Sequence, residues 1–147
     1  MHESARRGLR TLVAGAGVLA LIVIAIVALL RGCRSDEAIV SAAVDDARDA
    51  LVERDADAFM EFFGADVTYR GSGGHDALAR DVARWTREMR GGRITIVERR
   101  IDMDGDGARI SLRCDVGNIL QTFLTVDVTL LAERREGRWL VTRFDWK

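Results

Sequence analysis

The strongest constraint on the fold is an uncharged run of twenty residues near the amino terminus. Residues 11–30 read TLVAGAGVLALIVIAIVALL and contain no Asp, Glu, Lys or Arg. As a helix this run would be about 30 Å long, which matches the hydrocarbon thickness of a bilayer. The apolar part of a secretory signal is shorter, at about 7–15 residues. We therefore predict a single transmembrane helix at 11–30, followed by a juxtamembrane linker at 31–35.

The charges beside this run favour one orientation in the membrane. Three arginines precede it and two follow it: Arg6, Arg7, Arg10, Arg31 and Arg34. Positive-inside counting makes residues 1–10 a cytoplasmic tail and places the rest of the chain outside the cytoplasm. The expected location is the bacterial cytoplasmic membrane, with the lipid bilayer as a partner of residues 11–30. Two alternatives remain open: LLRGC resembles a lipoprotein box with Cys33 as the lipidated residue, and ARRGLR resembles a cleaved twin-arginine signal.

The remainder of the chain is acidic on balance. From Ser35 onward there are 17 basic and 22 acidic side chains, a net charge of −5. General nucleic-acid binding depends on neutralising phosphates, so this composition argues against it. The two cysteines provide no disulfide framework. Cys114 falls in a strand-like run and is expected to be a small buried apolar residue rather than a nucleophile.

Helical periodicity dominates the first half of the domain expected at 36–147. Apolar residues recur at steps of three and four along 36–54, which predicts a helix with one buried face. Asp55 is expected to cap a short second helix that Gly64 ends. The remaining predicted elements are a short strand at 66–70 and a third helix from His75 or Asp76 to about Arg90.

After Arg93 the apolar period changes to two, which is typical of half-buried strands. Four strands are predicted, at about 93–103, 108–117, 122–134 and 138–146. Ile94 and Ile96 have the opposite parity to Val97 and Ile101, so a β-bulge is expected near 96–97.

The acidic run DMDGDG, at 102–107, resembles the start of a calcium loop. Position twelve of that loop would be Arg113, where a bidentate glutamate is required. With Asp106-Gly107 as a tight turn, Met103 faces Ile110 and Ile101 faces Leu112, so that apolar residues meet. A hairpin turn is therefore the prediction, with calcium as the alternative. No metal and no cofactor are expected.

The last hairpin is expected to turn through a three-residue loop, Arg135-Glu136-Gly137. This register directs Phe144 and Trp146 to the core. The opposite face would then carry Leu131, Trp139 and Val141 among charged residues. Such a face predicts either a homodimer interface through these three residues or a partly covered outer surface.

The run ALVERDADAFMEFFGADVTYRGSGGHDALARDVARW, with EGRWLVTRFDW at the end, resembles the nuclear-transport-factor-2-like (NTF2-like) superfamily. That group includes SnoaL-like cyclases and ketosteroid isomerases, and the resemblance covers nearly all of 36–147. It implies an α+β, cone-shaped, cystatin-like fold in which three helices pack on a curved four-stranded antiparallel sheet. It also implies a cavity at the open end, for which the candidate lining residues are Phe59, Phe63, Tyr69, Trp85, Met89 and Trp146. An ordinary filled core is the alternative.

The catalytic pattern of the isomerases is missing from this sequence. They carry an acidic base just before the glycine loop, where this chain reads Thr68-Tyr69-Arg70, and a tyrosine on the first helix, which has none here. Asp115, a further acid to consider, has the parity of the outer face. No catalytic residue is therefore predicted.

We expect a membrane-anchored, extracytoplasmic binding or assembly domain that engages an unidentified protein partner or a small apolar ligand without catalysis. The plan is similar to that of the bitopic periplasmic component of type IV secretion channels. The alternative is a SnoaL-like isomerase, cyclase or hydrolase acting on an apolar small molecule, with Tyr69, His75 or Asp145 as polar participants. A basic stripe on the third helix, Arg80, Arg84 and Arg87, is either a solvated face or a contact for lipid phosphates or an acidic partner.

Overall fold

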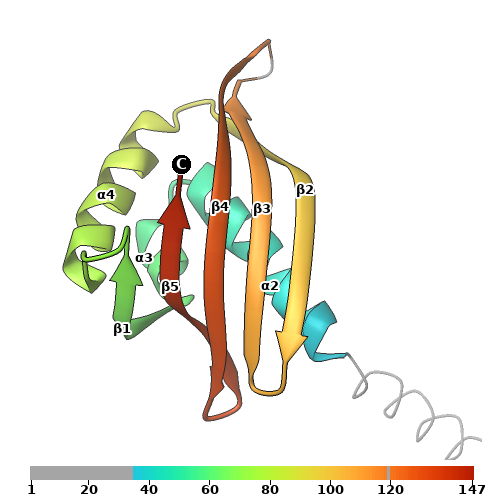
Figure 1. Ribbon diagram of the computed structural model, residues 1–147. Coiled ribbons are helices and arrows are strands. Elements are labelled where there is room, and N and C mark those ends of the chain that lie inside the picture. The colour runs from blue at the N-terminus through green and yellow to red at the C-terminus, as the bar shows by residue number, and fades with distance from the viewer. Residues whose placement is uncertain (1–34, 119) are drawn as a thin grey trace, which may run out of the picture. The chain divides into compact units, whose positions relative to one another are not determined.

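The computed structural model describes residues 35–118 and 120–147. The predicted tail at 1–10 and transmembrane helix at 11–30 lie outside these residues, as does most of the linker at 31–35. In the part of the chain that is described, no helix is both long and apolar enough to cross a membrane. The elements, in chain order, are α2 (Asp36–Val52), α3 (Ala56–Met60), β1 (Phe63–Tyr69), α4 (His75–Glu88), β2 (Arg93–Asp104), β3 (Gly107–Gly117), β4 (Thr122–Arg135) and β5 (Arg138–Trp146) (Figure 1).

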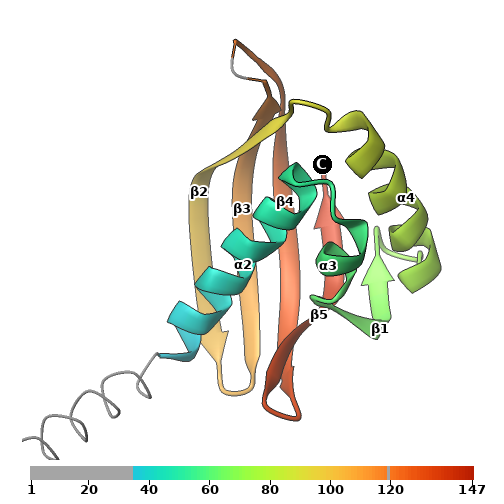
Figure 2. The same ribbon diagram turned by 180° about the vertical axis from the view of Figure 1, so that it is seen from behind.

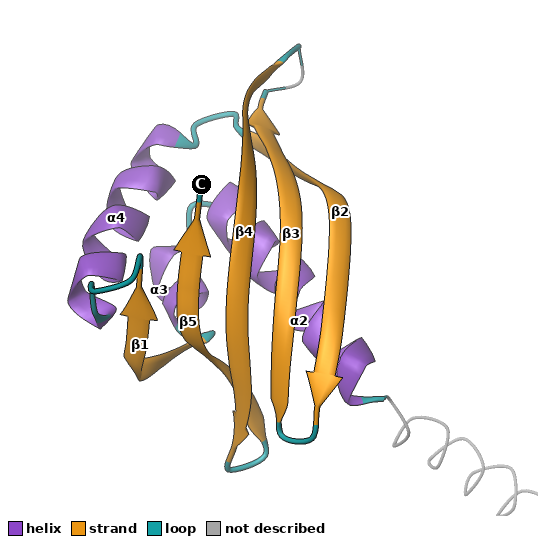
Figure 3. Ribbon diagram, in the orientation of Figure 1, coloured by secondary structure: helices purple, strands orange, loops and turns teal. Residues whose placement is uncertain are grey.

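The sheet has five strands in the order β1-β5-β4-β3-β2, so the prediction of four antiparallel strands is wrong. Strands β2 to β5 form the expected antiparallel meander, but β1 adds a fifth strand that runs parallel to β5 (Figure 3). Tyr69 is the register partner of Phe144, and the amide of Arg70 donates to the Phe144 carbonyl at 2.9 Å. The strand itself was predicted at 66–70, but its period of two carries no information about which distant strand it pairs with.

The three helices cover one face of this curved sheet. Figure 2 shows α2 crossing in front of β2, β3 and β4, with α3 beside it and α4 next to β1 and β5. Two apolar clusters fill the space between the layers. One joins α3, β1, α4 and β5 around Leu78 and Phe144, and the other joins α2 to β2, β3 and β4 around Val40 and Ile110. Burial of these faces supplies the main driving force for folding.

The helices form where their sequence signals predict. Asp55 caps α3, because its Oδ1 accepts a hydrogen bond of 2.9 Å from the amide of Ala58. Leu78 and Val82, at a spacing of four on α4, have no exposed surface. Gly64 does not end the short helix, since α3 stops at Met60 and Gly64 belongs to β1.

The β2–β3 hairpin confirms the acidic run as a turn but corrects its register. Asp104 pairs with Gly107, so the loop residues are Gly105 and Asp106, and Ile101 faces Ile110 instead of Leu112. Gly105 has φ of +56°, as the first residue of a type II′ turn requires. A shift of two residues leaves Ile101 and Met103 on their expected face, but Val97, expected on that face opposite Val116, lies in the bulge and is 53% exposed. The bulge predicted near 96–97 is confirmed between Ile96 and Glu98.

The β4–β5 hairpin turns through two residues, not the predicted three. Glu136 and Gly137 both have positive φ, which is the pattern of a type I′ turn, and Arg135 pairs with Arg138. A second irregularity, where Ala132 pairs with Val141 but Leu131 pairs with Arg143, returns the strand to its expected face. Phe144 and Trp146 therefore point inward as predicted.

Between the turn and this bulge, the register differs from the prediction by one residue. Trp139 and Val141 consequently pack into the apolar clusters on the helix-covered side, and their assignment to the outer face is wrong. Of the three residues expected there, Leu131 alone keeps its place, opposite Arg109 and Arg143. The homodimer remains a prediction, but Trp139 and Val141, two of the three residues proposed for its interface, are not on the outer face.

Candidate ligand-binding cavity

A cavity of about 530 Å³ lies between the helices and the sheet. Its size is typical of sites for small molecules. Side chains from α2, α3, α4 and all five strands contribute to its wall, and most of them are aliphatic or aromatic. Its sheet side includes Ile94, Ile96, Val116, Val126 and Val128.

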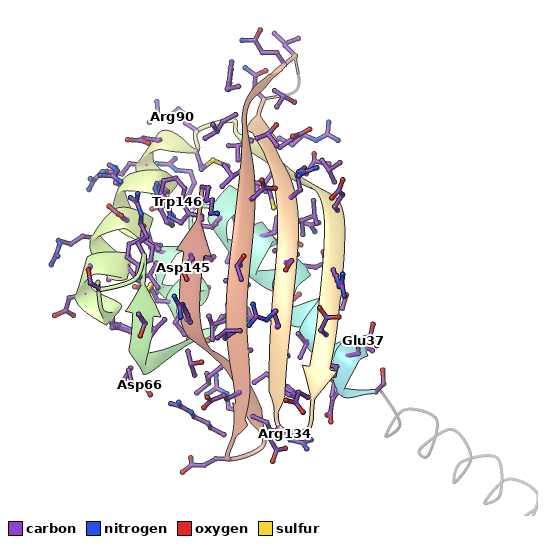
Figure 4. All side chains as sticks on the ribbon, in the orientation of Figure 1. Glu37, Asp66, Arg90, Arg134, Asp145 and Trp146 are labelled. Atoms are coloured by element: carbon purple, nitrogen blue, oxygen red, sulfur yellow. The ribbon has the colours of Figure 1, made fainter. Side chains whose placement is uncertain are left out.

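The mouth of the cavity is identified by exposure. Most of the lining residues are buried or half-buried. Five are exposed to solvent: Glu88, Arg90, Gly91, Phe123 and Leu124. The first three follow or end α4, and the last two lie at the start of β4. Arg93 pairs with Gly117, which brings the beginning of β2 to this same end of the sheet. Figure 4 shows Arg90 and Trp146 at this end of the molecule.

Five of the six predicted pocket residues line the cavity. Phe59 and Phe63 belong to its inner wall, Trp85 lies on α4 and Met89 at the C-cap of that helix, and Trp146 closes the side formed by β5. The Trp85 and Trp146 rings meet edge to face, with 6.0 Å between their centroids. The guanidinium of Arg70 lies 4.6 Å from the centroid of the Trp146 ring, a cation–π contact that helps to fix the indole.

Tyr69, the sixth candidate, is not among the lining residues and is almost fully buried in the core. Its hydroxyl donates to Asp81 at 2.7 Å and accepts from Nε1 of Trp146 at 3.1 Å. Burial raises the pKa of Tyr69, and the hydrogen bond to Asp81 raises it further. Tyr69 thus positions Trp146 instead of offering a group to a ligand.

The other polar participants considered from the sequence lie elsewhere. Asp145 bonds to Arg143 at 2.8 Å, and both share the outer face with Asp127 and Thr129. His75 is half-buried at the start of α4 and does not line the cavity. Within the described residues, no three His, Cys, Asp or Glu side chains gather as metal ligands would.

Few polar groups reach the cavity itself. Arg48 lines it, but is held in ion pairs with Asp45 and Asp49 at 3.2 and 2.8 Å. Cys114 also lines it, and burial raises the pKa of this thiol, which disfavours the nucleophilic thiolate. Glu88 is the single carboxylate among the described lining residues, and it lies at the mouth. Such a lining can enclose an apolar molecule. A charged group of the cavity would contact mainly the part of that molecule that lies at the mouth.

The sheet wall and the mouth were missed by reasoning from the sequence. The predicted strand at 122–134 treats Phe123 and Leu124 like its other residues, although Phe123 is 61% and Leu124 54% exposed. A signal was available, because two consecutive large apolar residues at the start of a strand cannot both face the same core.

Neither a family model nor a curated protein matches this chain. Several solved structures match its fold. An NTF2-like protein of unknown function from Pseudomonas putida KT2440 has a TM-score of 0.67 at 15% identity, over 76% of this chain and 84% of that one. A protein of unknown function with a cystatin-like fold from Nostoc punctiforme PCC 73102 gives 0.64 at 16% identity, over 74% and 87%. A candidate ketosteroid isomerase from Shewanella frigidimarina NCIMB 400 gives 0.62 at 20% identity, over 71% and 91%.

These likenesses define the class of fold. The described domain has the α+β, NTF2-like or cystatin-like fold on a curved sheet, as the sequence resemblance implied. At these identities the likeness concerns the fold alone, and that fold carries many unrelated functions.

Proposed function

We propose that this domain binds a small, largely apolar ligand in the cavity between its helices and its sheet, without chemical change to it. The observation that carries the proposal is the cavity of about 530 Å³ with its mainly aliphatic and aromatic wall. Binding there would be driven by removal of apolar surface from water. The scarcity of polar groups favours shape and apolar area over hydrogen bonding as the basis of selection.

The test is to purify the full chain, extract it with organic solvent and identify the released molecules by mass spectrometry. We expect an apolar compound at close to one per chain. Val126→Trp places an indole into the cavity from β4 and should abolish the co-purifying compound. Thr125→Trp is the matched control, because Thr125 is exposed on the other face and bonds to Asp115. Equal loss or equal retention in both variants would contradict the proposal.

An enzyme acting on an apolar small molecule is the second candidate. It is favoured by the open cavity together with Glu88, a carboxylate at the mouth. The assay is isomerisation of a β,γ-unsaturated ketone, followed by absorbance of the conjugated product. An enzymatic role requires turnover that Glu88→Gln removes, whereas a binding protein gives none with either form.

We also propose that residues 11–30 anchor the domain permanently in the bacterial cytoplasmic membrane, with the domain on the extracytoplasmic side. The uncharged twenty-residue run supports this, as does the arginine count on its two sides. Resistance to alkaline carbonate extraction, unchanged in Cys33→Ala, is expected for a spanning helix. Release of the Cys33→Ala variant would indicate a lipid anchor instead.

A further inference from the structure

The β3–β4 hairpin carries exposed apolar side chains at the mouth of the cavity and beyond it. Leu120 is 86% exposed, Phe123 61% and Leu124 54%, and these are three of the five exposed large apolar residues in the described part of the chain. Figure 1 shows this hairpin extending past the end of α4 and the start of β2. We call Leu120, Phe123 and Leu124 the apolar tip. Exposed apolar groups that cluster at one place mark a contact surface.

Positive charge lies beside the apolar tip. The segment 84–93 covers the end of α4, the loop 89–92 and the first residue of β2. It contains four arginines and one glutamate: Arg84, which is paired with Asp81 at 2.8 Å, Arg87, Arg90, Arg93 and Glu88. All five side chains are exposed. Arg90 lines the cavity mouth with Phe123 and Leu124, and Arg93 pairs with Gly117 at the base of the hairpin. The domain as a whole is acidic, so this basic segment is a local departure from its average charge.

The opposite end of the sheet has a different character. The β2–β3 and β4–β5 turns lie there, where Asp104, Asp106 and Glu136 are mixed with arginines and Asp106 is paired with Arg134 at 2.7 Å. None of the apolar tip residues is near this end. An anionic, partly apolar surface is therefore better matched by the end that holds the mouth, where exposed apolar residues and an excess of arginine lie together.

We propose that the apolar tip and the basic segment 84–93 dock the cavity mouth on an anionic lipid surface. Tip side chains would enter the interface while arginines contact the phosphates, a combination of apolar burial and charge that gives interfacial binding. Because Phe123, Leu124 and Arg90 also line the mouth, an apolar ligand would pass between bilayer and cavity without crossing water. The docking surface lies at the end of the sheet opposite the start of α2. A domain anchored through residues 11–30 and the short linker 31–35 would therefore dock on a second bilayer that faces the one holding its anchor.

The test measures capture of dye-labelled vesicles by the full chain, immobilised on beads through an amino-terminal tag. One vesicle population is phosphatidylcholine, and the other contains roughly one third phosphatidylglycerol. The chain is first reconstituted through residues 11–30 into phosphatidylcholine nanodiscs, so that this segment is already in lipid and does not itself capture the vesicles. We expect the anionic vesicles to be captured more strongly, with a preference that weakens as salt is raised.

Two variants outside the cavity lining remove one part of the surface each. Leu120→Ser should lower capture of anionic vesicles by more than about tenfold, and Arg93→Gln by about fivefold. Their matched controls, Val97→Ser and Arg109→Gln, are exposed residues away from the mouth and should behave as wild type. Capture that is insensitive to Leu120→Ser, or equal for both vesicle types, overturns the proposal and leaves a protein partner as the occupant of the tip.

The same preparations separate this proposal from the proposed function. Neither Leu120 nor Arg93 lines the cavity, so both variants should retain the co-purifying apolar compound. A wild-type chain that captures anionic vesicles but yields no such compound would refute ligand binding and leave docking in place. A chain that holds the compound but ignores the vesicles would refute docking alone.

Discussion

The hydroxyl of Tyr69 donates a hydrogen bond of 2.7 Å to Asp81, which joins β1 to α4 beside the aromatic wall of the cavity. The same hydroxyl accepts from Trp146, so one buried group organises three elements. Tyr69→Phe removes the hydroxyl, so Asp81 and Trp146 each lose a hydrogen bond. The free energy of unfolding should fall by about 1–2 kcal/mol. Urea denaturation at neutral pH measures the change. An unchanged midpoint would mean that water replaces the hydroxyl at no cost.

The raised pKa of Tyr69 predicts a loss of stability in alkali. Its contribution is complete below the unfolded pKa of about 10 and is lost as the pH rises towards the higher folded pKa. Wild type should therefore lose stability above about pH 10 more steeply than Tyr69→Phe. Tyr69 is the only tyrosine in the chain, so its ionisation can be followed directly by ultraviolet absorbance. Parallel pH profiles for the two proteins would contradict the prediction.

Arg99 ties the edge strand β2 to α2. Its guanidinium bonds to the Ser41 hydroxyl at 2.6 Å and to both oxygens of Asp45, and these bonds lower the pKa of Asp45. Both side chains are partly exposed, so Arg99→Gln should lower stability by no more than about 1 kcal/mol. Arg100→Gln is the control, since Arg100 pairs only with its neighbour Asp102 on the exposed face and should change nothing measurable.

The sign of the acid dependence follows from the lowered pKa of Asp45. A carboxyl of this kind contributes stability above its unfolded pKa and loses it as the pH falls through the folded value. Wild type should thus lose more stability than Arg99→Gln between neutral pH and about pH 3. Thermal unfolding across that interval checks the difference, and a constant gap between the two curves would argue against the ion pair.

Two leucines on helices test whether the cavity is empty. Leu78 on α4 is fully buried outside the cavity, whereas Leu51 on α2 is half-buried and lines it. Leu78→Ala should cost about 3 kcal/mol, because the space it leaves cannot collapse. Leu51→Ala should cost about 1 kcal/mol, since part of that side chain already faces open space. Equal losses would indicate a wall packed as tightly as the core.

Gly117 is required where β3 enters the apolar hairpin. A Cβ on this residue would lie 2.1 Å from the carbonyl oxygen of Gln121, a contact that the backbone must move to avoid. Gly117→Ala should destabilise the domain by about 1–3 kcal/mol and displace the tip. Gly74→Ala is the control, because a Cβ there meets nothing within 4 Å and should cost only a few tenths of a kcal/mol. Amide exchange along 117–124 reports the tip directly.

The sequence predicted the helices well because their signals are local. The period of apolar residues located α2 and α4, and Asp55 marked the start of α3 through a hydrogen bond that spans three residues. Parity of Ile94 and Ile96 against Ile101 was sufficient to predict the β2 bulge, since a strand with one buried face cannot change parity otherwise.

The errors concern features that no local pattern encodes. Glu136 takes a positive φ, which is uncommon for a residue other than glycine, and this shortens the last turn by one residue. The irregularity beside Val141 then depends on packing against α3 and β1, as does the parallel pairing of β1 with β5. Six pocket residues were proposed from the family resemblance, and five of them line the cavity. The resemblance did not predict the open mouth, because its position depends on how α4 and the β3–β4 hairpin pack together.

The parallel pairing of β1 with β5 has a consequence for synthesis. Trp146 reaches back 77 positions to bond with Tyr69, and the Phe144 ring packs beside Phe63 and Trp85. Until Phe144 and Trp146 leave the ribosome, the apolar sides of β1 and α4 that they cover stay exposed. A translational stall or nonsense codon before Phe144 would thus release a polypeptide whose β1 and α4 stay uncovered, and chaperones and proteases recognise such exposed apolar surface.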